Sequence, residues 1–143
     1  MIRLIVDLDT QSDERGRLVA IEARQDVPFP IQRVYYIFGT DRKANRGFHA
    51  HRQLEQLMVC TSGACTVTLD DGSSRKNFRL ENPTRGLLVG QMIWREMSDF
   101  TDDAVLMVLA SRHYEAEDYI RDYEKFISAR RTLKLAPTLA AHE

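Results

Sequence analysis

The sequence predicts an all-β fold in which two antiparallel sheets form a barrel or sandwich, followed by one C-terminal α-helix. About ten short segments alternate apolar with polar residues or are rich in β-branched and aromatic residues. Turns containing Gly or Asp separate these segments, as at Asp70-Asp71-Gly72. Short strands joined by such turns are typical of β-sandwiches and barrels.

The expected strands, in chain order, are residues 2–6, 17–22, 32–38, 47–51, 56–60, 65–69, 75–80, 86–89, 92–97 and 105–110. In the segment 65–69, Cys65, Val67 and Leu69 alternate with threonines, which is the period-two pattern of a half-buried strand. From residue 115 to about residue 130 the apolar residues follow helical spacing instead. We therefore expect a helix there that lies against the barrel.

The chain has 143 residues, the size of one ordinary domain. We expect a single domain over 1–131 and a flexible C-terminal tail over 132–143, which has no periodicity. The net charge of −1 argues against a nucleic-acid or membrane-surface protein. No targeting segment or membrane span is recognisable. Because the location expected is cytoplasmic, Cys60 and Cys65 are expected as reduced thiols, although a disulfide between them stays conceivable.

His49 and His51 are the sharpest chemical signal. Residues i and i+2 of a strand share a face, so both imidazoles should enter the same space. Glu55 completes the spacing His-x-His-x-x-x-Glu, which is typical of a metal site. The strand that should supply a further ligand carries Arg95 instead, and arginine offers no lone pair. We therefore favour no metal and no cofactor, and keep an exposed histidine pair and a metal site as alternatives.

Two neighbouring imidazoles suit general acid–base catalysis, because the reference pKa of about 6.5 makes both protonation states accessible near neutrality. Moving a carbonyl to the next carbon through an enediol requires one proton to be removed and one to be delivered. The candidates for substrate binding are four arginines and a tyrosine: Arg17, Arg33, Tyr35, Arg46 and Arg95. Arg46 is the best candidate for a phosphate, although surface arginines and a barrel tyrosine are alternatives.

Several segments resemble the WxcM-like dTDP-sugar 3,4-ketoisomerases of the cupin superfamily. These segments are residues 15–22, 33–38, 46–51, 54–56, 69–72, 108–111 and 118–121, within a resemblance that spans about residues 3–128. The resemblance implies a jelly-roll subunit, a homodimer and a metal-independent isomerase. The implied substrate is dTDP-4-keto-6-deoxy-D-glucose, whose carbonyl moves from C4 to C3. A sugar aminotransferase would then use the product in building a bacterial surface glycan.

The resemblance also implies roles for individual residues. His49 and His51 match the catalytic histidine pair of the family. Arg17 and Arg95 stand at positions that vary in the family and bear on the configuration delivered at C4, which the sequence leaves open. Two alternatives remain, a metal-dependent cupin enzyme and a non-catalytic cupin that binds a sugar nucleotide.

Overall fold

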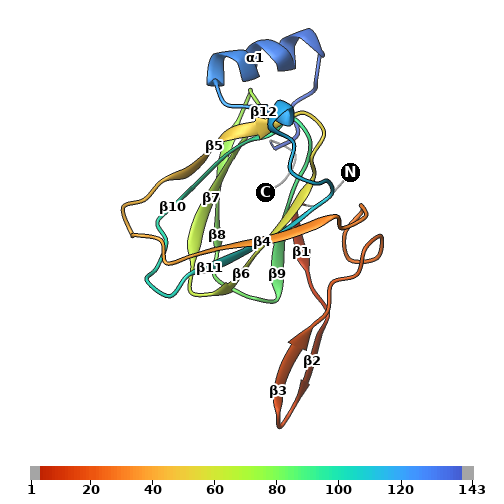
Figure 1. Ribbon diagram of the computed structural model, residues 1–143, viewed down its shortest axis with the longest axis vertical. Helices are drawn as coiled ribbons and strands as arrows, with labels where there is room; N and C mark the ends of the chain where they lie inside the picture. Colours follow the sequence, from red (N-terminus) through yellow and green to blue (C-terminus); the bar gives the residue numbers. More distant parts are fainter. Residues whose placement is uncertain (1–3, 140–143) are drawn as a thin grey trace.

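The computed structural model describes residues 4–139, and its main feature is a pair of five-stranded antiparallel sheets (Figure 1). The first sheet has the strand order β1 (Ile5–Asp7), β9 (Arg85–Val89), β6 (Gln56–Ser62), β11 (Val105–Ala110) and β4 (Arg33–Phe38). The second has the order β12 (Tyr119–Ile120), β5 (Arg46–His51), β10 (Trp94–Ser98), β7 (Cys65–Asp70) and β8 (Arg75–Leu80). The predicted cupin-type jelly roll is confirmed.

The main hydrophobic core lies between the two sheets. Cys65, Val67 and Leu69 of β7 are fully buried there, as their alternation with threonines predicted. They pack in one cluster with inward residues of the first sheet, such as Leu106 and Val108 of β11. Burying an aliphatic side chain of this size contributes about 1.5–3 kcal/mol. Neither Cys60 nor Cys65 forms a disulfide.

The outer face of the first sheet is partly covered by the N-terminal part of the chain. Val27 and Phe29 pack there against Leu57 and Leu109. Before them, the hairpin of β2 (Thr10–Asp13) and β3 (Gly16–Val19) projects away from the barrel (Figure 1). The strand expected over 17–22 corresponds to β3 but ends earlier, and β2 was not predicted. The first strand begins at Ile5, and residues 2 and 3 of the expected range lie outside the described residues.

The predicted helix over 115–130 begins later in the structure, because tertiary pairing takes over its first part. A short 3-10 turn (Ala116–Asp118) leads into β12, where Tyr119 pairs with His51 and Ile120 with Ala50. The helix α1 (Tyr123–Thr132) follows, with the Asp122 carboxylate accepting the backbone N–H of Lys125 at 3.0 Å as its N-cap.

Helix α1 lies over one end of the barrel, as expected from the sequence (Figure 1). It buries Phe126 against Trp94, whose ring is 4% exposed and belongs to the core beneath the helix. The backbone N–H groups of Thr138 and Leu139 donate to Asp71, and Leu139 is fully buried. Asp71 thus holds the backbone at these two residues, and the flexibility expected for 132–143 stays a prediction. The domain boundary at residue 131 stays a prediction.

Within residues 4–139, the structure contains no helix with the length and apolar character needed to cross a membrane.

Candidate active site

The site is built on β5, which carries both histidines beside β10. His49 pairs with Arg95, and the register between the two strands shifts at the next residue. Gly47 has a φ of +89°, and a Cβ atom there would lie 2.9 Å from the Arg95 carbonyl oxygen. Only glycine therefore permits this close approach. The two imidazole rings lie edge to face, with centroids 4.8 Å apart, so the predicted histidine pair is confirmed as a geometric unit.

A cavity of about 340 Å³ opens on His49. It is lined by residues of β4, β5, β10 and the β12 region: Arg33, Tyr35, Ile37, Arg46, Gly47, His49, Met97, Tyr119 and Arg121. Four of the residues singled out in the sequence therefore meet in one place, although they come from two different sheets. On β4 the inward face carries Arg33, Tyr35 and Ile37, while the alternate residues are exposed. The cavity thus combines a histidine with several guanidinium groups.

Tyr119 and Arg121 were missed by sequence reasoning. The Tyr119 ring lies 4.8 Å from His49 and 4.3 Å from His51, and the Arg121 guanidinium lies 4.2 Å from the Tyr119 ring. The segment was interpreted as helical. In the structure Asp118 and Ile120 are buried while Tyr119 is half-buried and Arg121 is exposed, and this alternation results from the pairing of β12 with β5.

His51 lies behind His49, away from the cavity wall. Its side chain is 2% exposed, and Nδ1 lies 3.2 Å from Oδ2 of Asp118 without an aligned hydrogen bond. The same carboxylate accepts the backbone N–H groups of Gln53 at 2.8 Å and Leu54 at 3.2 Å. Asp118 therefore holds the turn that follows the histidine strand.

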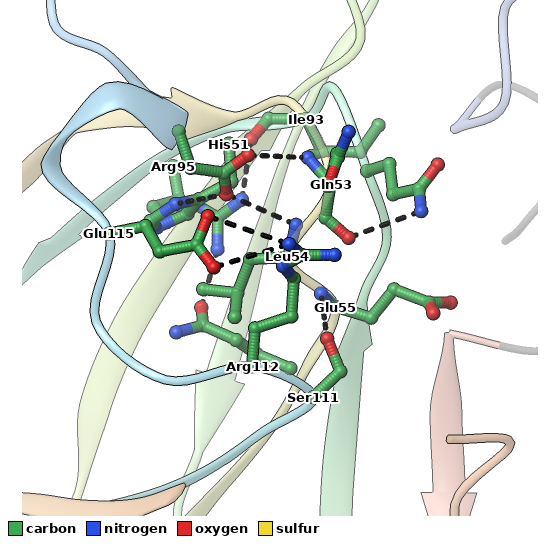
Figure 2. Close-up of polar contacts among 12 residues, drawn as sticks. His51, Gln53, Leu54, Glu55, Ile93, Arg95, Ser111, Arg112 and Glu115 are labelled. Atoms are coloured by element: carbon green, nitrogen blue, oxygen red, sulfur yellow. Dashed lines mark hydrogen bonds and ion pairs between the residues drawn. The ribbon is translucent and has the colours of Figure 1, made fainter. Parts of the chain in front are cut away.

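Arg95 is fully buried and does not line the cavity. Its Nη1 donates to Oε1 of Gln56 and its Nη2 donates to the Ile93 carbonyl at 2.8 Å. Figure 2 shows Arg95 beside His51 and Ile93. Arg95 is absent from the residues that line the cavity, and its expected contact with the substrate stays a prediction. Its charge acts on the histidines.

The histidines remain neutral over a wider pH range than the sequence suggested. Burial, followed by the charge of Arg95, lowers the pKa of His49 to about 4, although a contact with the Gly47 backbone acts in the opposite direction. Burial and then Arg95 lower the pKa of His51 to about 2. The interpretation of two groups titrating near neutrality is thus wrong. Both imidazoles are in the form that can accept a proton.

The rate constant kcat/KM is therefore expected to stay level from pH 8 to about pH 5 and to fall only toward pH 4. The folded-state pKa of His49 lies below its unfolded value, so the unfolded chain binds more protons below pH 6.5. The free energy of unfolding should accordingly fall with pH from about 6.5 to 4. Rate profiles combined with circular dichroism measure both effects, and exposed His113→Asn is the control. An acid limb centred at pH 6.5 that persists in His113→Asn would contradict this.

Two other residues singled out in the sequence lie elsewhere. Arg17, on the projecting hairpin, lines a separate groove of about 230 Å³ with Val59 and Met107 on the outer face of the first sheet. The carboxylate of Glu55 points away from His51 (Figure 2). Among residues 4–139, no three His, Cys, Asp or Glu side chains converge as metal ligands. The described residues therefore do not form the metal site that the spacing of His49, His51 and Glu55 suggested.

Comparison with known proteins identifies relatives of this chain in sequence and in structure. The chain is 54% identical over 114 residues to a TDP-4-oxo-6-deoxy-α-D-glucose-3,4-oxoisomerase of Aneurinibacillus thermoaerophilus, covering 80% of this chain and 82% of the relative. A TDP-quinovose 3,4-ketoisomerase of Campylobacter jejuni, WlaRB, is 46% identical with a TM-score of 0.85, over 87% of this chain and 95% of that one.

A third relative is a mutant of the 3,4-ketoisomerase QdtA from Thermoanaerobacterium thermosaccharolyticum, solved in complex with TDP-4-keto-6-deoxyglucose. It is 37% identical with a TM-score of 0.89, over 95% of this chain and 100% of that one. The family model described as WxcM-like, C-terminal (FdtA) matches residues 2–131. Nearly the whole described barrel, with the histidine cavity, lies inside this match, and the chain belongs to the WxcM-like, C-terminal family.

Proposed function

We propose that this protein is a 3,4-ketoisomerase that converts dTDP-4-keto-6-deoxy-D-glucose into a dTDP-linked 3-keto-6-deoxyhexose. The observation that carries the proposal is the neutral His49 imidazole in a cavity lined by arginines, with the neutral ring of His51 beside it. The relatives above, named for this reaction or solved with this sugar nucleotide, support the same conclusion.

His49 is assigned as the first base, because it lines the cavity while His51 lies behind it. His49 takes the proton from C3, and the electron pair forms an enediolate whose charge sits on the C4 oxygen. An imidazole of the pair then protonates C4. The C3 hydroxyl loses its proton as the new carbonyl forms, and the C4 oxygen takes up a proton to become the new hydroxyl, so that substrate and product are isomers. Positioned acid–base groups of this kind contribute about 10²–10⁴-fold in rate.

Three guanidinium groups at the cavity suit the diphosphate. Arg33, Arg46 and Arg121 all line it, and arginine pairs with phosphate oxygens in a bidentate manner. Arg46 and Arg121 are exposed in the free chain. We assign Arg46 as the main diphosphate contact and Tyr35 as the group that faces the sugar.

Incubation with dTDP-4-keto-6-deoxy-D-glucose, followed by NMR of the hexose, tests the proposal. We expect the carbonyl carbon to move from C4 to C3, and the couplings at C4 read its configuration. Turnover should survive EDTA, and added zinc, iron or manganese should not raise it. Loss with EDTA and recovery with metal would favour the metal-dependent cupin enzyme. Binding of dTDP without any change in the hexose would favour the non-catalytic cupin.

We further propose that the active form is a homodimer. The outer face of the edge strand β4 exposes three apolar residues, with Val34 53%, Tyr36 64% and Phe38 68% exposed. An edge strand with such a face needs cover, and a second copy of this chain would supply it. Strand β1 lies at the other edge of the same sheet, and its expected part in the interface stays a prediction.

The mass in solution at micromolar concentration should be that of two chains. Tyr36→Glu combined with Phe38→Glu should shift it to one chain, while His113→Asn, at an exposed residue outside β4, should not. A monomeric wild type would end this proposal. The expected role of Arg17 at the sugar stays a prediction. We also keep the proposals of a cytoplasmic location and of a sugar aminotransferase as the next enzyme.

A further inference from the structure

Three side chains form a hydrogen-bonded chain that begins behind the cavity and ends in its wall. Nη1 of Arg95 donates to Oε1 of Gln56, and Nε2 of Gln56 donates to the Tyr35 hydroxyl at 3.0 Å. Arg95 is fully buried and Gln56, the first residue of β6, is 1% exposed. Tyr35 lies at the cavity end of this chain, in the wall that also contains His49.

The direction of these hydrogen bonds follows from the chemistry of the groups. A guanidinium has donors only, so the amide of Gln56 must turn its oxygen toward Arg95. The opposite orientation would place the NH₂ group against a buried cation. The NH₂ group therefore faces Tyr35, and the Tyr35 oxygen acts as acceptor. Because Gln56 cannot accept the single hydroxyl proton, that proton is left for another acceptor.

A bound keto sugar would bring a further acceptor into the cavity, beside the neutral His49 ring and the Tyr119 hydroxyl of the same wall. The Arg33 guanidinium lies 5.2 Å from the centroid of the Tyr35 ring, and it has donors only. The C4 oxygen of a keto sugar accepts hydrogen bonds and becomes more negative in the enediolate. Donors held in place before the reaction stabilise such a charge without a cost of reorganisation.

We propose that Gln56 is a positioning residue: locked by Arg95, it makes the Tyr35 hydroxyl a hydrogen-bond donor to the substrate oxygen that carries the enediolate charge. This inference rests on the proposed ketoisomerase function. It assigns Arg95 a role through Gln56, without direct contact with the sugar. Gln56 itself does not touch the substrate.

Two substitutions of similar size separate this role from a structural one. In Gln56→Glu, one carboxylate oxygen pairs with Arg95 and the other accepts the Tyr35 proton, so the donor is lost to the substrate. In Gln56→Met, Tyr35 keeps its proton for the substrate, but buried Arg95 loses an acceptor. We expect the thermal stability of Gln56→Glu to exceed that of Gln56→Met. Turnover should follow the opposite order, with wild type first, Gln56→Met second and Gln56→Glu last. A purely structural role would place both quantities in the same order.

The magnitude of the loss follows from the donor that disappears. Gln56→Glu and Tyr35→Phe should each lower kcat by about 10²-fold, the effect of losing one donor to a developing oxyanion. The KM for the sugar nucleotide should change by less than about threefold, because binding of the diphosphate does not involve these groups. Gln91→Glu adds the same charge at an exposed residue outside the cavity and should leave kcat unchanged.

A double mutant excludes a general effect of the new negative charge. If Gln56 acts through Tyr35, then Gln56→Glu in a Tyr35→Phe background should cause almost no further loss. Turnover of the keto sugar by the wild type tests the proposed ketoisomerase function separately. An inactive wild type would overturn both that function and the role of Gln56. With an active wild type, three results would each overturn the role of Gln56 alone. They are wild-type kcat in Gln56→Glu, a lower kcat in Gln56→Met than in Gln56→Glu, or multiplicative losses in the double mutant.

Discussion

His49→Asn is expected to lower kcat by about 10²–10⁴-fold while the affinity for dTDP stays close to that of the wild type. Asparagine keeps a polar side chain of similar reach but cannot accept the proton from C3. His51→Asn should also reduce turnover, but by less, because His51 is 2% exposed and lies behind the cavity wall. Turnover followed by NMR and calorimetric titration with dTDP measure the two quantities.

The matched control is His113→Asn, since His113 is exposed and outside the cavity. In deuterated water the wild type should place deuterium at C4 of the product, because the imidazoles exchange their protons with solvent. Near wild-type turnover in both His49→Asn and His51→Asn would contradict the scheme. So would a product whose C4 carried only hydrogen from C3, since that result requires a shielded single base or a hydride shift.

Asp118→Ala should have the largest effect on stability among the residues near the site. Its buried carboxylate accepts the N–H groups of Gln53 and Leu54, which alanine would leave without acceptors. At about 1–3 kcal/mol for each of the two lost partners, the free energy of unfolding should fall by about 2–6 kcal/mol. For a domain of this size the Tm should fall by roughly 5–20 °C, which differential scanning calorimetry measures.

Asp122→Ala is a suitable comparison because Asp122 also accepts a backbone N–H, but at the exposed N-cap of α1. Losing this N-cap should lower the free energy of unfolding by only about 1 kcal/mol. Asp118→Asn keeps one acceptor oxygen and should fall between the two. A Tm for Asp118→Ala no lower than that for Asp122→Ala would show that the turn after His51 does not depend on this carboxylate.

Much of the site was predictable because it depends on local periodicity. A strand places residues two apart on one face, so His49 and His51 share a face wherever β5 lies in the fold. The same rule placed Arg33 and Tyr35 together on the inward face of β4 and left Val34 and Tyr36 outside. The alternation in β7 identified the core for the same reason.

Other parts of the site depend on residues that are distant in the sequence. Tyr119 faces the histidines because β12 pairs with β5, a contact between segments about 70 residues apart. Locally, residues 115–130 have helical spacing, and only this pairing makes their beginning a strand. Similarly, no local pattern shows that the hairpin carries Arg17 away from the cavity of its own chain.

The sequence by itself determined the all-β class, the histidine pair and the arginine-rich cavity wall. Tertiary structure alone decided how these groups behave chemically. Burial and the charge of Arg95 lower the pKa of both histidines, and burial is a property of the assembled barrel. Arg95 acts on Gln56 only because β10 and β6 belong to sheets that pack face to face. The chemical type of each side chain can therefore be read from the sequence. Its burial and its hydrogen-bond partners depend on contacts between segments that are distant in the sequence.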